Sequence, residues 1–150
     1  MGKKMINFKK ITEENFDAII KMKRPDDENF VASNAVSLAQ AWLYRDDGDV
    51  FPFAIYNDDT IVGFMLLEEE TAESSLVLWR VMFPPEYENK GYGTAAIKLL
   101  IEYAKNSGRY KNLSLICSPE NIIARHIYDK LGFEPTGQIL YGDVEMQLNL

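Results

Sequence analysis

The sequence predicts a single domain, residues 1–150, of the mixed α/β (α+β) class. Three observations support this prediction. Residues 50–83 contain three successive runs of β-forming side chains. Gly91 and Gly93 then open a long helical pattern of apolar residues, and a second helical pattern ends at Gly132. Strands and helices therefore follow one another along the chain, and no linker, internal repeat or low-complexity tract divides it.

Alternating and helical patterns of apolar residues place the elements of the first half. We expect a strand at 6–11, a helix at 13–22 capped by Thr12, a helix at 34–44, and strands at 50–56, 61–68 and 76–83. The apolar set of the helix at 34–44 consists of Val36, Leu38, Ala39, Trp42 and Leu43.

The second half alternates helices with strands. The helical pattern after the glycines stops at 106–108, and a strand at 113–117, a helix at 121–131 and a closing hairpin at 136–140 and 144–148 follow. The helix at 121–131 is preceded by Pro119 and followed by Gly132, which suit its start and its stop. Ile123, Ile127 and Leu131 fall on one face of this helix, with Ala124 and Tyr128 beside them.

Composition excludes several classes of function. A net charge of −7 removes the long-range attraction that nucleic acids and acidic membrane surfaces need, so we expect neither as a partner. No apolar run reaches the ~18 residues of a membrane span, and no apolar segment behind the first lysines predicts a signal peptide. The single cysteine, Cys117, fits a reducing cytoplasm and is expected to be a small buried strand residue. The chain contains one cysteine and one histidine, His126, which are too few for us to expect a catalytic triad or a zinc site.

The stretch from Val81 to Thr94 carries the first functional signal, because a strand ends in two prolines and Gly91 and Gly93 then open a helix. The first N–H groups of a helix lack intrahelical partners and carry partial positive charge, which predicts a site for a phosphate-bearing ligand. The P-loop pattern Gly-x-x-x-x-Gly-Lys-Ser/Thr is absent. Residues 91–96 fit a dinucleotide-binding pattern, but the next strand ends in Ser-Pro where an acidic residue should hold a ribose. From the loop alone, a pyrophosphate loop of an acetyl-CoA-dependent N-acetyltransferase and a plain helix start both remain.

A second motif, Asn-x-x-Ala-x-x-x-Tyr-x-x-x-Gly-Phe, spans Asn121 to Phe133. Downstream of a Gly-x-Gly loop, it resembles the GNAT superfamily of N-acetyltransferases, and the resemblance covers the chain from Ile6 to the C-terminus. The resemblance implies a GNAT fold, a mixed, twisted β-sheet of about seven strands flanked by about four helices, and acetyl-CoA (coenzyme A) as co-substrate. It implies the element order β-α-α-β-β-β-α-β-α-β-β, which the patterns above also give. Members commonly dimerise, so a homodimer is the assembly that it suggests.

The resemblance also assigns roles to residues. It places the backbone of Val81, Met82 and Phe83 on pantetheine, the N–H groups of Asn89, Lys90, Gly91, Tyr92, Gly93 and Thr94 on pyrophosphate, and Asn121 beside the pantetheine arm. Tyr128 matches the tyrosine that protonates the departing CoA thiolate as general acid in many members; by pattern alone it is a half-buried helix aromatic. Arg125 and Lys130 are candidate phosphate contacts or solvated charges.

One position departs from the family. The loop usually begins with Gln or Arg three residues before its first glycine, and here that residue is Glu88. A carboxylate beside a pyrophosphate is unfavourable unless it turns outward into solvent. We therefore expect Glu88 to point outward, with Lys90 and the backbone N–H groups carrying a weakened but retained affinity for acetyl-CoA.

The acceptor is indicated by a closer resemblance, to bacterial spermine/spermidine (diamine) acetyltransferases. The segments that carry it are 79–82, 30–34, 37–39 and 141–143. Polyamines are cationic at neutral pH, so a small-molecule amine site should contain carboxylates and aromatic rings. The candidate substrate-binding residues are Glu28, Glu68, Trp79 and Arg80, with Glu69 and Glu70 beside Glu68. Each acid is also explained as a solvated surface residue.

Two questions stay open at this level. In some polyamine acetyltransferases a carboxylate on the strand before the loop helps deprotonate the amine, but Trp79 occupies that position, so no base is identified. Water relayed through Glu28 or Glu68 is a hypothesis. The acceptor could also be a protein N-terminus, a lysine or an amino sugar, and a non-catalytic acyl-CoA-binding module is a further alternative.

Overall fold

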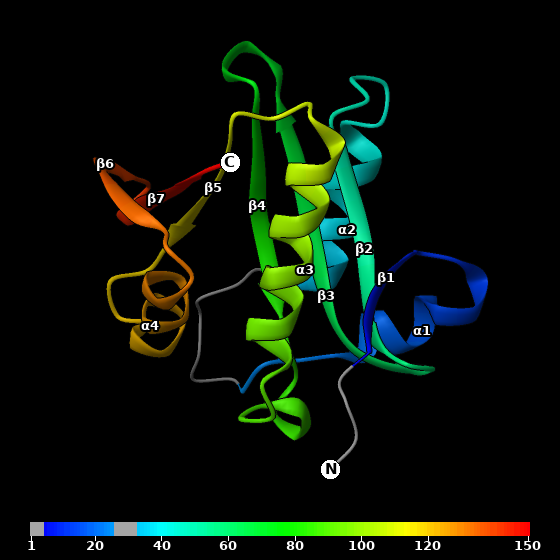
Figure 1. The fold of residues 1–150 in the computed structure, drawn as a ribbon. Helices are drawn as coiled ribbons and strands as arrows, with labels where there is room; N and C mark the ends of the chain where they lie inside the picture. The colour runs from blue at the N-terminus through cyan, green and yellow to red at the C-terminus, as the bar shows by residue number, and fades with distance from the viewer. Residues whose placement is uncertain (1–4, 26–32) are drawn as a thin grey trace.

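A computed structural model describes residues 5–25 and 33–150. Within these ranges the elements follow the predicted order (Figure 1). The strands are β1 (Ile6–Lys10), β2 (Val50–Asn57), β3 (Thr60–Glu70), β4 (Ser75–Met82), β5 (Asn112–Cys117), β6 (Glu134–Leu140) and β7 (Asp143–Asn149). The helices are α1 (Glu13–Lys21), α2 (Asn34–Leu43), α3 (Tyr92–Ser107) and α4 (Ile122–Lys130), with short 3₁₀ turns at Thr71–Glu73 and Pro85–Tyr87. The predicted order is confirmed, and element ends differ from prediction by a few residues.

The seven strands of the described residues form one sheet, in the order β1-β2-β3-β4-β5-β7-β6. Neighbouring strands are antiparallel except β4 and β5, which are parallel. Parallel neighbours need a crossover connection, and α3 supplies it. The expected mixed sheet with four helices is therefore confirmed for the described residues.

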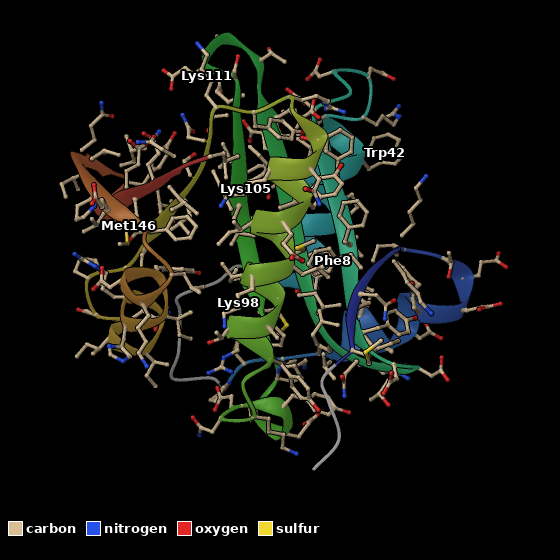
Figure 2. The ribbon with its side chains drawn as sticks, in the orientation of Figure 1. Phe8, Trp42, Lys98, Lys105, Lys111 and Met146 are labelled. Atoms are coloured by element: carbon tan, nitrogen blue, oxygen red, sulfur yellow. The ribbon has the colours of Figure 1, made fainter. Side chains whose placement is uncertain are left out.

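Helices cover both faces of the sheet. α3 lies across one face, and α1 and α2 lie across the other (Figure 1). The core under α3 contains Ala96, Ile97, Leu100 and Ala104 together with Met65, Leu67, Leu76 and Leu113, whereas Ile19, Ala54, Phe64, Leu66 and Met82 form the opposite core. β3 thus supplies alternate residues to the two cores, as strand geometry requires. Phe8 packs against the core under α3, whereas Lys98 and Lys105 of this helix are exposed; the three residues are labelled in Figure 2.

Most of the apolar set of α2 faces away from the core. Exposed side chains include Val36, Trp42 and Leu43, at 46%, 65% and 60%. The helix instead turns Ser37, which is fully buried, and the half-buried Gln40 toward β4, where both accept hydrogen bonds from Arg80. A guanidinium taken partly out of water needs acceptors, so polar residues of α2 occupy the inward face, with Leu38 packing beside them.

No described helix combines the length and apolar character of a membrane-spanning segment.

Candidate active site

β4 and β5 run side by side for only part of their length. Their pairing joins Ser75–Leu78 to Asn112–Leu115, after which β5 continues against β7 and β4 only against β3. Trp79 lies at a bulge, because the residues that flank it in β4 oppose adjacent residues of β3. A bulge bends its strand. The two strands therefore diverge toward the glycine loop (Figure 1), and residues 80–82 have no strand partner on their β5-facing edge among the described residues.

The diverging end of β4 contains the residues predicted to contact pantetheine. Val81 is half-buried, Met82 is buried, and Phe83 follows the strand. A Cβ at Gly63 of β3 would lie 2.7 Å from both the Met82 carbonyl oxygen and Phe83 Cδ1, so only glycine fits beneath this turn of chain. The structure thus places all three residues beside the opening, while their contact with pantetheine stays a prediction.

The glycine loop presents a series of unpaired donors. Asn89 and Gly91 adopt left-handed backbone conformations, with φ of 58° and 80°, and α3 begins at Tyr92 without a side-chain cap. Across the described chain, no acceptor is paired with the backbone N–H groups of residues 89–94, and the first N–H to bond, that of Ala95, donates to Gly91 at 3.1 Å. Consecutive N–H groups at a helix start form an anion site. The loop therefore fits a pyrophosphate without requiring any side-chain contact.

The side chains of Lys90 and Tyr92 extend from this segment of backbone donors. Lys90 is exposed, with its Nζ 6.0 Å from the centre of the Tyr87 ring. The Tyr92 hydroxyl accepts a hydrogen bond from Asn57 Nδ2 at 3.4 Å, and its ring meets that of Tyr87 edge-on at 6.1 Å. Thr94 is half-buried at the helix start. The residues predicted for pyrophosphate thus form one continuous segment, which spans the end of the loop and the first turn of α3.

Glu88 was expected to point outward into solvent, but its carboxylate forms an ion pair with the Arg24 guanidinium. The Glu88 side chain is 38% exposed. Arg24 follows α1, and its Nη1 also donates to the Phe83 carbonyl at 2.6 Å. The sequence prediction missed this residue, because nothing in the local pattern connects a charged loop after α1 with the glycine loop.

Tyr128 is the most buried polar side chain of α4. It is 8% exposed and Ala124 and Leu131 pack in the same core, whereas Ile123, on the same predicted face as Leu131, is 73% exposed. The Tyr128 ring packs edge-on against Phe133 at 5.7 Å, and its hydroxyl has no hydrogen-bond partner in the described part of the chain. Burial, with the nearby Cys117 thiol, raises the Tyr128 pKa above its usual value. The hydroxyl therefore stays protonated at neutral pH.

α4 lies next to the glycine loop. A Cβ at Gly93 would be 3.9 Å from Ile127 Cδ1, one residue before Tyr128. Asn121 caps α4, because its Oδ1 accepts the Ala124 N–H at 3.3 Å. The role of Asn121 beside pantetheine stays a prediction. Its side-chain Nδ2 takes no part in the capping bond, which uses Oδ1.

Cys117 and the two α4 cations have local explanations. Cys117 is buried as expected, its Sγ lies 3.6 Å from the Ser118 carbonyl, and burial raises its thiol pKa. A thiol held protonated is a poor nucleophile, which supports its structural interpretation. Arg125 Nε pairs with Asp129 at 3.1 Å within the helix, and Lys130 lies exposed in the last turn, where a cation suits the helix dipole. Phosphate contacts by Arg125 and Lys130 stay predictions.

Trp79 and Arg80 lie together on the α2 side of the sheet. The Arg80 guanidinium is 4.7 Å from the Trp79 ring centre, and the Tyr44 ring lies 6.4 Å from that of Trp79. Arg80 Nη1 donates to Ser37 Oγ at 3.2 Å and to Gln40 Oε1, and burial lowers the Arg80 pKa. No carboxylate forms an ion pair with Arg80 in the described ranges.

The predicted acidic residues divide between the two faces of β3. Burial, then Glu70 and Asp49, raise the Glu68 pKa, so these three acids lie near one another. Glu69 points to the other face, where it pairs with Arg109 and accepts from the Tyr110 hydroxyl at 2.5 Å. Alternation along the strand thus places Glu68 and Glu70 on one face and Glu69 on the other. Glu28 and the segment 30–32 lie outside the described residues.

The parts of this site form one arrangement. The strand opening lies beside the unpaired loop donors, and α4, which contains the buried and protonated Tyr128, lies next to the same loop. Loop donors of this kind can hold a phosphate-bearing ligand, and a protonated tyrosine can donate a proton to a leaving group. The model of the acetyltransferase (GNAT) family matches residues 16–133. The chain therefore belongs to this family, whose co-substrate is acetyl-CoA.

Characterised relatives include polyamine acetyltransferases. The chain is 25% identical over 141 residues to the spermine/spermidine N(1)-acetyltransferase of Bacillus subtilis (strain 168), covering 89% of this chain and 91% of that protein. It is 33% identical over 89 residues to the spermidine N(1)-acetyltransferase of Escherichia coli (strain K12), covering 59% of this chain and 48% of that protein. The chain spans about half the length of the first curated relatives that it matches.

Solved structures share the fold. Spermidine N-acetyltransferase from Vibrio cholerae, in complex with CoA and spermine, matches with a TM-score of 0.77 at 17% identity, over 96% of this chain and 95% of that one. The PaiA N-acetyltransferase from Thermoplasma acidophilum, in complex with coenzyme A, matches with a TM-score of 0.72 at 18% identity, over 97% and 99%. These likenesses confirm the predicted GNAT fold.

Proposed function

We propose that the protein transfers the acetyl group of acetyl-CoA to a primary amine of a polyamine, spermine or spermidine, by direct attack. The observation that carries the reaction is the strand opening between β4 and β5 beside the unpaired loop N–H groups, with α4 and its buried Tyr128 next to the loop. The polyamine acceptor is supported by the relatives named above and by the acids around Glu68.

The donor site is built mainly from backbone. The N–H groups of residues 89–94 would hold the pyrophosphate, and the unpaired edge of 80–82 would hold the pantetheine amides in the manner of an added strand. This positions the thioester where β4 and β5 separate. A backbone site of this kind depends on the fold and tolerates variation of side chains such as Glu88.

Tyr128 supplies the proton in this mechanism. The neutral amine attacks the thioester carbon, the carbon–sulfur bond breaks, and the thiolate takes the Tyr128 proton, while the proton lost by the acylated nitrogen returns to the Tyr128 phenolate. Burial raises the pKa of Tyr128, and a thiolate in the same dry environment also gains proton affinity, since burial disfavours both anions. The phenol therefore stays protonated between turnovers and remains able to donate to a developing thiolate.

The amine must lose a proton before it attacks. Its usual pKa is near that of lysine, about 10.4, so at neutral pH a base or a desolvating site is needed. Glu68 is a candidate base through water, because its raised pKa makes it a stronger base than an ordinary carboxylate. If Glu68→Gln leaves the pH–rate profile unchanged, this role is excluded.

One observation favours a second acceptor class. Arg80 is a half-buried cation without a carboxylate partner in the described ranges, next to the predicted acceptor residue Trp79. A cation there repels a polyamine and attracts a carboxylate. A peptide acceptor that carries its own carboxylate is therefore the alternative.

Thiol release from acetyl-CoA tests the proposal, with spermine, spermidine, a lysine peptide and an aminoglycoside as acceptors. We expect saturable turnover with spermine or spermidine. Turnover with the peptide alone would select the second class. Calorimetric CoA binding without turnover would leave only an acyl-CoA-binding module.

Tyr128→Phe tests the acid. We expect kcat to fall by about a hundredfold, the lower end of typical general-acid contributions, with CoA affinity unchanged. Tyr103→Phe is the matched control, because Tyr103 is exposed on α3 far from the loop. An equal loss in both variants would remove the specific role of Tyr128.

A further inference from the structure

Arg24 connects two parts of the candidate site that are far apart in the sequence. Its Nη1 donates to the Phe83 carbonyl at 2.6 Å, and the same guanidinium pairs with the Glu88 carboxylate. Phe83 precedes the two prolines that end the strand region, and Glu88 follows the 3₁₀ turn at Pro85–Tyr87. The side chain of Arg24 is only 21% exposed, so it is partly desolvated at this junction.

The position of Glu88 creates an electrostatic problem for a phosphate ligand. Glu88 immediately precedes the unpaired N–H groups of residues 89–94. A carboxylate a few ångströms from a phosphate opposes binding, and the effect grows where water is excluded. The ion pair with Arg24 places a positive charge against this carboxylate, so their combined charge is near zero.

We infer that Arg24 is an affinity residue for the phosphates of acetyl-CoA, which acts by neutralising Glu88 at the edge of the glycine loop. The inference rests on the proposed use of this loop for pyrophosphate. An arginine that follows α1 thus compensates for an acid in the connection between β4 and α3.

Charge neutralisation has a signature that a purely structural contact lacks. Arg24→Gln leaves Glu88 uncompensated, so the Kd for CoA and the KM for acetyl-CoA should rise about tenfold. Glu88→Gln leaves the arginine charge beside the loop, so CoA should bind as tightly as to the parent or several-fold more tightly. The double variant restores a neutral pair, and its Kd should return to within about threefold of the parent. Double-mutant non-additivity is thus the main expectation.

Three controls separate this effect from general charge and from folding. Lys23→Gln and Glu86→Gln change the net charge equally at exposed neighbouring positions and should leave Kd within about twofold. Arg24→Lys keeps the charge and should bind nearly as the parent. Thermal melting of each variant shows whether it is folded, and Glu88→Gln tests the sign of the effect without changing Arg24.

The donor itself can be varied. S-acetylpantetheine lacks the pyrophosphate, so Arg24→Gln should leave its KM unchanged while raising that of acetyl-CoA. The acetyl-CoA defect should also shrink as salt is added, because ions screen the repulsion.

Calorimetry with CoA distinguishes the possible failures. If the parent protein does not bind CoA, the proposed function fails. If the parent binds but Arg24→Gln has no effect, or the double variant is as weak as Arg24→Gln, the inference is overturned and the proposed function stands.

Discussion

The two ends of helix α3 differ in how their polar groups are satisfied. At the C-terminal end, Gly108 closes the helix in a left-handed conformation, and Ser107 Oγ donates to the Ala104 carbonyl at 2.8 Å. Next to it, Glu69 pairs with Arg109 and Tyr110, so the charges are neutralised within the protein. At the N-terminal end the described chain provides no side-chain cap, and no acceptor for the N–H groups of residues 89–94.

This difference separates stability from function along one helix. Helix ends normally find partners for their free backbone groups, in side chains, in water or in a ligand. The C-terminal end uses the protein's own side chains and contributes to folding. The exposed N-terminal end keeps its donors available, which is what an anion-binding site requires.

Gly93→Val should show the largest effect, at the N-terminal end. A Cβ there would lie 3.7 Å from Phe83 Cε2, an ordinary contact, so the protein itself has room for the first carbon. The branched side chain would cover neighbouring N–H groups, and we expect the KM for acetyl-CoA to rise about a hundredfold, ~2.7 kcal/mol. The melting temperature should hold or rise, because glycine is a poor helix former. An unchanged KM for acetyl-CoA would contradict the assignment of ligand binding to the N-terminal end of α3.

Glu69→Ala should act on stability and not on binding. The carboxylate accepts from the Tyr110 hydroxyl and pairs with Arg109, so its loss should cost about 2 kcal/mol of unfolding free energy. Denaturant unfolding measures this cost, and calorimetry with CoA should detect no change. Tyr110→Phe removes one of these bonds and should cost less. A large loss of CoA affinity in Glu69→Ala would show that the two ends are coupled.

Gly108→Ala is the counterpart of the Gly93 variant at the C-terminal end. The position has φ of 67° and open space around a Cβ, so the cost is backbone strain alone, about 1 kcal/mol. At this chain length that corresponds to roughly 2–4 °C in melting temperature. Acetyl-CoA kinetics should be unaffected; a raised KM would contradict a purely structural role.

Glu68 lies on the opposite face of β3 from Glu69, and no described cation neutralises it. Burial and its acidic neighbours raise its pKa above the usual 4.5, so the folded state holds this proton more tightly than the unfolded state. As pH rises above 4.5 the unfolded state releases the proton first, and stability falls. Glu68→Gln should therefore reduce the loss of melting temperature between pH 4 and pH 7, a small effect that Glu86→Gln should not reproduce. If the melting temperature of Glu68→Gln fell more than that of the parent between pH 4 and pH 7, the prediction would be contradicted.

Local patterns were good predictors of the backbone and of its order. The element order, the glycine loop and the motif from Asn121 to Phe133 all follow from the periodicity and spacing of near neighbours. Family membership, which these motifs predicted, is confirmed by the match to residues 16–133. The roles of individual site residues remain predictions, since they depend on bound substrates.

The sequence patterns did not determine which face of each helix is buried. In α2, Ser37 and Gln40 face Arg80 of β4 and accept its hydrogen bonds, while Trp42 of the apolar set is exposed. A helical pattern reports amphipathicity, and the partner across the interface decides which face is buried. In α4 the core contains Tyr128, Ala124 and Leu131, while Ile123 of the same apolar pattern is exposed.

The sequence alone thus determined the strands and helices, their order and the glycine loop, because each depends on residues adjacent in the chain. Tertiary structure decided the side-chain partners: Arg24 with Glu88, Arg80 with α2, and Glu69 with Arg109. Charges attract through space and not along the chain, so such pairs form only after the sheet has brought distant segments together.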